Sequence, residues 1–322
     1  MLRYYLWGLG EKTLSYVPLG KRFYKTVGLI TKRNTCGNRP TFASSLRLAR
    51  KAKDYMVPGA VAMEVGTGWY HHDAFLLYLI SDNTTVYLFD IEDQGRVRYI
   101  HNYLRNLLAH VDRLDDELGV DSDRTREKLE PLLQLDSREA IYERCGFVPM
   151  ITADTDTPWL EEQSIDFMVS NCVLNHIPPA ILEPELDSLK RMLKPDGAMH
   201  HLLGHDDHWA FHDSKANMFQ YYRYSDRHYR RFFETKLEYQ NRMVKGEWLA
   251  LFDRVGLDVL DYYEHVTDGS RKAITEIPID ERYRRWPLDD LAIVYSYVLL
   301  GPRPAGSPDR AAVAARSAGP ER

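Results

Sequence analysis

From residue 60 onward, short apolar runs alternate with stretches in which apolar residues recur at helical spacing. This alternation predicts an α/β fold, a mostly parallel sheet with helices on both faces. The predicted strands are residues 60–65, 85–90, 147–152, 165–170, 197–203, 257–265 and 291–300. The predicted helices are residues 44–56, 73–80, 96–118, 129–142, 182–193 and 247–255.

The same pattern divides the chain into three parts. Residues 1–58 mix aromatic and basic side chains and predict a helical N-terminal cap or lid. Residues 59–302 hold the alternating pattern, with a helical insertion at 119–146 and a substrate-cap segment at 204–246 that is rich in His, Asp and Tyr. Residues 303–322 are rich in Pro, Gly, Ala and Arg, and they predict a disordered tail.

Composition excludes several classes of function. A formal net charge of −5 offers no overall basic field for nucleic acid. No apolar run approaches the roughly 20 residues of a membrane span, so no integral membrane segment is expected. The three cysteines, Cys36, Cys145 and Cys172, lie far apart, which argues against disulfides and favours a cytoplasmic location. None of these observations excludes that the protein forms a homo-oligomer.

The glycine-containing segment Val61–Tyr70 is the first candidate for chemistry. A short apolar run there ends in Glu64-x-Gly66-x-Gly68, and a helical pattern follows at once. This order predicts a buried strand, a tight glycine turn and a helix that begins beneath a ligand. By itself the motif is a weak signal, and its meaning depends on the residues that follow the other strands.

Polar side chains follow each of the next predicted strands. Asp90 and Asp154 end two of them, and Asn171 to His176 follow the strand at 165–170. Open α/β sheets bind ligands at the carboxyl ends of their strands. There, Asp90 can accept hydrogen bonds from a ribose diol, and Asp154 can accept one from an adenine amino group. Taken singly, each aspartate could equally cap a helix or form a turn. Together they favour an adenosine-type ligand.

NAD is the first rival for that ligand. In the dinucleotide fingerprint, His71 would take the place of the third small residue, while Asp90 comes at a tolerable distance. However, Glu64 does not belong to that fingerprint, and the polar residues after the strand at 165–170 would remain unexplained. The sequence therefore favours another adenosine-containing cofactor.

Together these motifs resemble the class I S-adenosylmethionine-dependent methyltransferases. The resemblance rests on residues 63–68, 89–90, 151–154, 164–177 and 193–197, and it covers residues 60–300. It implies a Rossmann-like seven-stranded, mostly parallel sheet with an antiparallel last strand, and S-adenosylmethionine as cofactor. In such proteins the glycine turn flanks the methionine part of the cofactor. The cofactor-binding residues that it implies are Glu64, Gly66, Thr67, Gly68, Asp90, Ile91, Asp154 and Asn171.

A narrower resemblance concerns the acceptor. Residues 66–69, 207–213, 222–226 and 239–242 are similar to a methyltransferase subgroup associated with bacterial glycan and secondary-metabolite pathways. It implies O-methylation of a hydroxyl on a sugar, glycoside or secondary metabolite, that is, a small-molecule or glycan acceptor. One departure is Asn175, because family members commonly have Glu before the histidine at this place. This departure bears on the acceptor more than on the cofactor.

O-methylation requires a group that removes the hydroxyl proton, within hydrogen-bond reach of the acceptor. Such a base should follow the strand at 165–170 or the strand at 197–203. His208 is the first candidate, with Asp207 as its orienting partner. His205 and His176 are the reserves. The candidate acceptor-binding residues are Asn175, Tyr222, Arg223 and Arg242.

Alternatives remain open at this stage. The His and Asp residues between 205 and 213 could bind a divalent metal, but no fixed ligand spacing supports this, and no metal is predicted. The same scaffold could carry an N-methyltransferase or an enzyme that uses S-adenosylmethionine without methyl transfer. It could also be a catalytically silent binding subunit.

Overall fold

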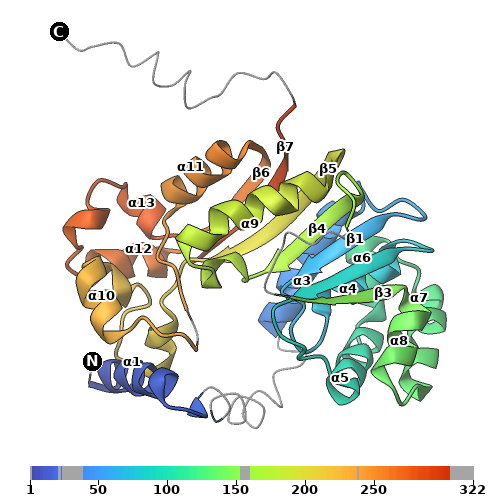
Figure 1. The fold of residues 1–322 in the computed structure, drawn as a ribbon, viewed down its shortest axis with the longest axis horizontal. Coiled ribbons are helices and arrows are strands. Elements are labelled where there is room, and N and C mark those ends of the chain that lie inside the picture. The colour runs from blue at the N-terminus through green and yellow to red at the C-terminus, as the bar shows by residue number, and fades with distance from the viewer. Residues whose placement is uncertain (1, 21–22, 24–38, 153–159, 238, 305–322) are drawn as a thin grey trace.

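The seven strands of the protein form one sheet, as a computed structural model that describes residues 2–20, 23, 39–152, 160–237 and 239–304 shows (Figure 1). The strands are β1 (Val61–Val65), β2 (Thr85–Asp90), β3 (Phe147–Ile151), β4 (Ile165–Asn171), β5 (Leu193–Gly204), β6 (Leu257–His265) and β7 (Tyr295–Pro302). Their order is β3-β2-β1-β4-β5-β7-β6, and β7 is antiparallel to both of its neighbours. The predicted Rossmann-like sheet with an antiparallel last strand is confirmed.

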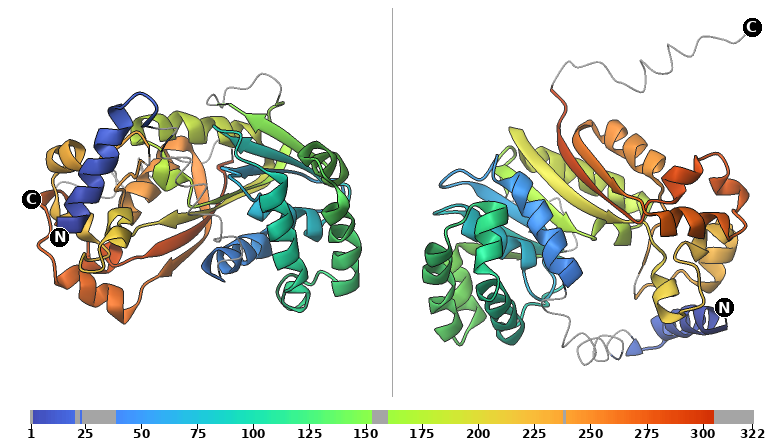
Figure 2. Two further views of the ribbon diagram at one scale, coloured as in Figure 1. Left: turned by 90° about the horizontal axis from the view of Figure 1, so that it is seen from below. Right: turned by 180° about the vertical axis from the view of Figure 1, so that it is seen from behind.

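Helices cover both faces of this sheet (Figures 1 and 2). The α-helices of the described residues are α1 (Leu2–Tyr16), α3 (Arg39–Ala52), α4 (His72–Ile80), α5 (Val97–Leu108), α6 (Val111–Leu118), α7 (Ser122–Leu129), α8 (Arg138–Cys145), α9 (Pro179–Met192), α10 (Asp226–Phe232), α11 (Lys245–Val255), α12 (Asp268–Thr275) and α13 (Leu288–Leu291). Short 3₁₀ turns connect them: η2 (Pro131–Gln134), η3 (Leu174–His176), η4 (His208–His212), η5 (Gln220–Arg223) and η6 (Glu281–Tyr283).

Two cores lie on opposite faces of the sheet because successive strand side chains point in opposite directions. In β4, Phe167 packs into the core beneath α3 to α8, whereas its neighbour Met168 packs against α9 and α11. In β5, Leu202 and Leu203 divide between the two cores in the same way. The sheet is therefore the middle layer of three.

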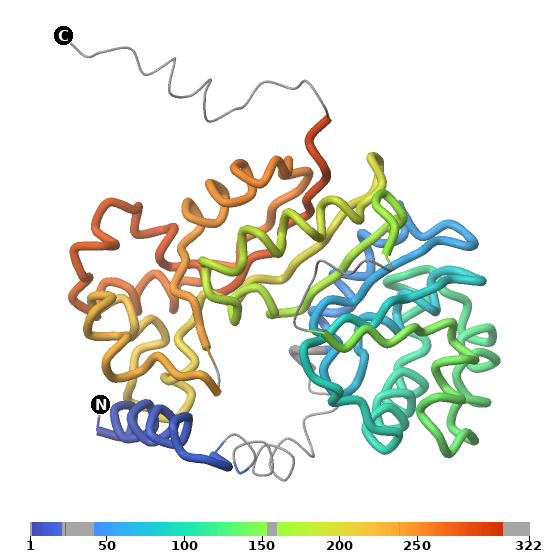
Figure 3. Tube along the Cα trace, in the orientation of Figure 1, coloured from blue at the N-terminus to red at the C-terminus, as the bar shows by residue number. Residues whose placement is uncertain are grey.

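A third, aromatic core holds the remaining helices together. It gathers buried rings from α1, η4, η5 and α10, among them Tyr4, Trp209, Tyr222 and Phe233. The N-terminal helix thus packs against residues some 200 positions further along the chain (Figure 3). In contrast, α3 packs on the sheet beside α4. Helices α1 and α3, both within the predicted N-terminal cap of residues 1–58, therefore cover different parts of the molecule. The predicted domain boundaries remain predictions.

Two predicted helices are wrong in their extent. The helix predicted at 96–118 breaks at His110, where the imidazole Nδ1 donates to the carbonyl of Asn106 at 2.8 Å. The backbone N–H of His110 turns instead to the carbonyl of Leu107, so the helix ends and α6 begins. The helix predicted at 129–142 is interrupted at Pro131, which has no N–H to donate and begins η2.

Two boundaries also differ at the end of the chain. Residues 291–294, predicted as the start of the last strand, precede β7, because α13 occupies Leu288–Leu291. The predicted disordered tail, 303–322, lies almost entirely outside the described residues. Arg303, which is described, forms ion pairs with Asp253 at 2.5 Å and with Asp258 at 2.9 Å.

Candidate functional site

The loops after β1, β2, β4 and β5 meet at one edge of the sheet, which we call the carboxyl edge. In the loop after β1, Gly66 and Gly68 have φ angles of +74° and +58°, a left-handed backbone that favours glycine. A β-carbon on Gly66 would lie 2.3 Å from Val173 Cγ2, whereas one on Gly68 would meet nothing nearer than a carbonyl oxygen at 3.9 Å. The glycine at 66 therefore makes room for Val173, and the open space lies at Gly68.

Asp90, at the end of β2, is fixed directly beside this turn. Its Oδ2 accepts a hydrogen bond from the Gly68 N–H at 2.9 Å, and its Oδ1 accepts one from the Glu92 N–H at 3.0 Å. Burial raises the pKa of the carboxyl. Each oxygen can still accept a further bond, as a diol would require. The exposed side chain of Ile91 follows at once and offers an apolar surface.

Glu64 accepts hydrogen bonds from the turn and from the start of α4. Its Oε1 accepts from the Asp73 N–H at 3.0 Å, at the start of α4, and its Oε2 accepts from Thr67 Oγ1 at 2.9 Å. Burial, and then the nearby charge of Asp73, raise the pKa of this carboxyl. A carboxyl group at a helix N-terminus satisfies backbone donors that the helix leaves unpaired. We therefore assign Glu64 to capping α4 rather than to direct contact with a cofactor.

A chain of hydrogen bonds links the turn to the helical insertion. Thr67 Oγ1 lies 2.6 Å from His71 Nδ1, and His71 Nε2 lies 2.6 Å from the hydroxyl of Tyr142 on α8. Burial lowers the pKa of His71 to about 3, so the imidazole is neutral. Sequence reasoning missed this role, because it considered His71 only as a misfit to the dinucleotide fingerprint.

At the end of β4, Asn171 contacts helix α3. Its Nδ2 lies 3.2 Å from the hydroxyl oxygens of both Ser44 and Ser45. Asp73 lies in the same cluster, and its Oδ1 has no hydrogen-bond partner among the described residues. Burial raises the pKa of Asp73 to about 6, opposed by hydrogen bonds from Ser45 and Asn171. Helix α3 therefore forms part of the wall at the carboxyl edge.

The most exceptional polar group at this edge is Asn175. Its side chain is 1% exposed, and neither its Nδ2 nor its Oδ1 has a hydrogen-bond partner among the described residues. A β-carbon on Gly204, at the end of β5, would lie 3.6 Å from Asp206 Oδ1, 3.8 Å from Asn175 Nδ2 and 3.9 Å from Cys172 Sγ. These three groups thus converge on the space that Gly204 leaves.

Asp206 was passed over in sequence reasoning in favour of its neighbours. Burial raises the pKa of its carboxyl to about 6, and that of the Cys172 thiol to about 12. The thiol is therefore protonated near neutral pH. The carboxyl of Asp206 titrates close to neutrality, and Asn175 can both donate and accept. The only signal in the sequence was the position of Asp206, directly after a strand.

His176 and His208 lie together on η3 and η4, with ring centroids 4.9 Å apart. His176 Nδ1 lies 2.7 Å from the carbonyl oxygen of Tyr239. A carbonyl can only accept, so Nδ1 carries the proton and Nε2 of the neutral ring is the acceptor. The tautomer of His176 is therefore fixed in the way a general base requires.

Asp207 does not have the role that we predicted. Its carboxylate accepts from the Tyr4 hydroxyl at 2.6 Å and from the Trp209 N–H at 2.9 Å, and it is completely buried. It therefore caps η4 and holds α1, instead of orienting His208. Likewise His205 is buried, with Nε2 2.8 Å from Ser296 Oγ, and burial lowers its pKa to about 4. We no longer count His205 among the candidate bases.

The segment 239–241 joins the loops after β4 and β5. Gln240 accepts from the His208 N–H at 3.2 Å and donates to the Asp206 carbonyl at 2.5 Å. Asn241 Nδ2 donates to the carbonyls of Leu174 and Ile177. With Tyr239 bound to His176, these three residues fix η3 beside η4.

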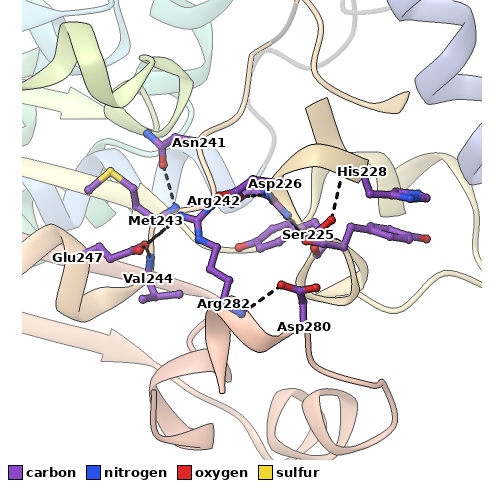
Figure 4. Close-up of polar contacts among 12 residues, drawn as sticks. Ser225, Asp226, His228, Asn241, Arg242, Met243, Val244, Glu247, Asp280 and Arg282 are labelled. Atoms are coloured by element: carbon purple, nitrogen blue, oxygen red, sulfur yellow. Dashed lines mark hydrogen bonds and ion pairs between the residues drawn. The ribbon is translucent and has the colours of Figure 1, made fainter. Parts of the chain in front are cut away.

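Arg242 has a structural role instead of the predicted contact with the acceptor. Its guanidinium donates to the carbonyls of Tyr221 and Tyr224, at 3.2 and 2.7 Å, and pairs with Asp226 (Figure 4). Tyr222 is likewise completely buried in the aromatic core. Arg223, in contrast, is exposed on η5.

One predicted cofactor-binding residue is not placed by the structure. Asp154, the predicted adenine-binding residue, lies outside the described residues. Among the residues that are described, no group of three or more His, Cys, Asp or Glu side chains is arranged to hold a metal ion. No helix in the same part of the chain is long and apolar enough to cross a membrane.

Comparisons with known proteins give structural likeness only. No protein-family model matches the sequence, and no curated protein matches it. Among solved structures, the chain is similar to the 1,6-didemethyltoxoflavin-N1-methyltransferase of Burkholderia thailandensis, with bound S-adenosylhomocysteine, at 10% identity and a TM-score of 0.45, over 88% of this chain and 87% of the other. It is also similar to the geranyl diphosphate C-methyltransferase of Streptomyces coelicolor, at 10% identity and a TM-score of 0.41, over 79% and 78%.

Proposed function

We propose that this protein is an S-adenosylmethionine-dependent methyltransferase. The observation that carries the proposal is the Asp90 carboxylate, held at the carboxyl edge by the N–H groups of Gly68 and Glu92. The carboxylate keeps capacity for the two hydroxyls of a ribose, and the turn beside it is open at Gly68. The sheet order, with its reversed last strand, accords with the methyltransferase resemblance of the sequence.

The residues at the carboxyl edge fit such a cofactor. Asp90 would hold the ribose, the backbone at Gly68 would lie along the methionine part, and Ile91 would cover the adenine ring. Asp154 remains the predicted partner of the adenine amino group. When bound, S-adenosylmethionine supplies an electrophilic methyl group on a sulfonium centre.

We assign the acceptor side to the loops after β4 and β5. Asn175 and Asp206 would hydrogen-bond the acceptor, which would complete the partners that the Asn175 amide lacks. His176 would take the hydroxyl proton on Nε2, since its Nδ1–H is held by the Tyr239 carbonyl. The ring of His208, the first candidate from the sequence, lies tilted beside that of His176 with the centroids 4.9 Å apart, and His208 becomes the second candidate base. This arrangement supports O-methylation of a hydroxylated small molecule, such as a sugar, glycoside or secondary metabolite.

Calorimetric titration with S-adenosylmethionine and S-adenosylhomocysteine tests the proposal. The wild-type protein should bind both, and Asp90→Ala should weaken binding by about ten-fold or more, because a hydrogen bond to a charged group contributes roughly 1.5–3 kcal/mol. The matched control is Asp82→Ala, which removes an exposed carboxylate just before β2, at the opposite end of that strand. Its affinity should be unchanged.

Failure of the wild-type protein to bind either compound would overturn the proposal. Binding without turnover would instead indicate a catalytically silent subunit. To distinguish these outcomes, the protein is incubated with methyl-labelled cofactor and a metabolite extract, and labelled products are detected by mass spectrometry. The chemical class of the methylated product decides between oxygen and nitrogen acceptors.

A further inference from the structure

Helix α1 has two apolar faces. Its inner face buries Tyr4, Gly8 and Glu11. Its outer face carries Leu2, Leu6, Leu9 and Tyr16, with exposed fractions of 74%, 58%, 49% and 66%. Their spacing of four, three and seven residues keeps them on one side of the helix. Of the nineteen large apolar residues that the described chain exposes, eight fall within residues 2–23, so the exposed apolar surface is concentrated there.

Basic groups flank this apolar stripe. Helix α10 runs beside α1, where the Lys12 ammonium donates to the Arg230 carbonyl and the Tyr5 hydroxyl lies 3.2 Å from His228 Nε2 (Figures 1 and 2). At the end of the stripe, the Lys236 ammonium lies 5.6 Å from the centre of the Tyr16 ring.

This flank carries an excess of positive charge. Residues 2–16 and 212–237 together carry eight Lys or Arg against four Asp or Glu, although the whole chain has a net charge of −5. Arg227, Arg230 and Arg231 of α10 are exposed, and within the described part of the chain none of them has a carboxylate within ion-pair distance. Among the described residues, the apolar stripe is therefore bordered by positive charge that no carboxylate pairs.

We propose that the outer face of α1, with the arginines of α10, binds the surface of an anionic lipid bilayer. A surface helix with exposed apolar side chains and basic neighbours can lie in the plane of the interface, with the apolar side chains among the acyl chains and the basic groups at the headgroups. A second copy of the chain fits less well. A two-fold interface uses the same patch on both subunits and would therefore bring the positive charges of both copies into one interface, where like charges repel.

Membrane binding by α1 does not depend on the proposed function, but it would place a bilayer close to the proposed acceptor side. The inner face of α1 is fixed to the acceptor side, since the Tyr4 hydroxyl donates to Asp207 immediately before His208. A bilayer bound to the outer face would therefore lie one helix diameter from the residues of η4.

Co-sedimentation with lipid vesicles tests this inference. The full chain should pellet with vesicles of phosphatidylcholine and phosphatidylglycerol, and remain in the supernatant with phosphatidylcholine alone. Added salt should weaken binding, because it screens charges at the surface. The double variant Leu6→Glu with Leu9→Glu, and the double variant Arg227→Glu with Arg231→Glu, should each reduce binding at least ten-fold.

The control is Leu288→Glu, which alters a comparably exposed leucine, 51% accessible, on α13. It should bind vesicles as the wild type does, and circular dichroism should show that all variants are folded. Wild-type protein that ignores anionic vesicles would overturn the inference. So would a wild-type dimer that the Leu6 and Leu9 double variant converts to a monomer without any vesicle binding, because the occupant would then be a second copy.

Discussion

The buried side chain of Asn175 lowers the stability of the folded protein if its polar atoms stay unpaired. A buried polar group without a partner destabilises a folded protein by roughly 1–3 kcal/mol, and the Asn175 side chain has no partner among the described residues. Asn241, whose backbone N–H donates to the Asn175 carbonyl at 2.8 Å, has a side chain that is hydrogen-bonded. Its side-chain nitrogen is bonded to two carbonyls of the η3 region. The two asparagines therefore form a matched pair for experiment.

Asn175→Leu should leave the free energy of unfolding unchanged or raise it by about 1 kcal/mol, since it removes unpaired polar atoms. The same change should raise the KM for the acceptor. Asn241→Leu should lower the free energy of unfolding by about 2 kcal/mol, because it removes the side-chain donor from the carbonyls of Leu174 and Ile177. Urea denaturation measures both. A large loss of stability in Asn175→Leu would show that this amide has partners in solution and is structural.

The pKa of Asp207 provides a second prediction at the scale of one residue. Burial raises it from 3.8 to about 7 in the folded protein. Between these values the folded state holds a proton that the unfolded chain has released, so this group makes folding less favourable as pH rises from about 4 to 7. Asp207→Asn lacks this effect. The stability of the variant relative to wild type should therefore rise with pH, by up to about 1.4 kcal/mol per pH unit between pH 5 and 7.

Thermal unfolding across that pH range measures the difference. Asp82→Asn serves as control, because paired lysine and arginine lower the pKa of this exposed carboxylate and it stays ionised above pH 5. Its stability relative to wild type should be constant between pH 5 and 7. A constant difference in Asp207→Asn as well would show that Asp207 is ionised throughout the range.

The turn between β1 and α4 is the element on which the candidate site depends. Gly66 needs glycine for two reasons, a φ of +74° and the contact with Val173, whereas Gly59 has a φ of +82° and open space around it. Gly59→Ala should therefore lower the free energy of unfolding by about 1 kcal/mol from backbone strain alone. Gly66→Ala should lower the free energy of unfolding by roughly 1–3 kcal/mol more than that, because the new β-carbon overpacks the site.

Chemical denaturation of both variants checks this difference, and Val173→Ala provides the third measurement. Added to Gly66→Ala, it should recover part of the lost stability, because it removes the methyl group that lies 2.3 Å from the new β-carbon. Equal losses in Gly59→Ala and Gly66→Ala would mean that Val173 can move aside at no cost.

At the same scale, the sequence predicted which loops carry polar groups but not how those groups are used. Asp90 and Glu64 are both acids at strand ends. The Asp90 carboxylate keeps capacity for further hydrogen bonds, whereas the Glu64 carboxylate caps α4. Residues 239–242 were noticed only as part of a resemblance. Their contacts with η3 and the loop after β5 span more than 30 residues of sequence, and no local pattern encodes such pairings.

For the whole molecule, the alternation of strands and helices was sufficient to predict an α/β sheet, and the family resemblance supplied the reversed last strand. The third core was not predicted. It assembles Tyr4 of α1 with Phe219, Tyr229 and Phe233, which lie more than 200 residues further along the chain. The same contacts decide the role of Asp207, so its misassignment followed from the missing core.

The position of β7 has a consequence for the synthesis of the protein. Residues 295–302 are the last described strand along the chain, yet they pair with β5 on one side and β6 on the other. Until they emerge from the ribosome, the outer edge of β5 presents unpaired backbone groups, and β6 has no neighbour in the sheet. Between the emergence of β5 and that of β7, the nascent chain must therefore be kept from aggregating through that open edge.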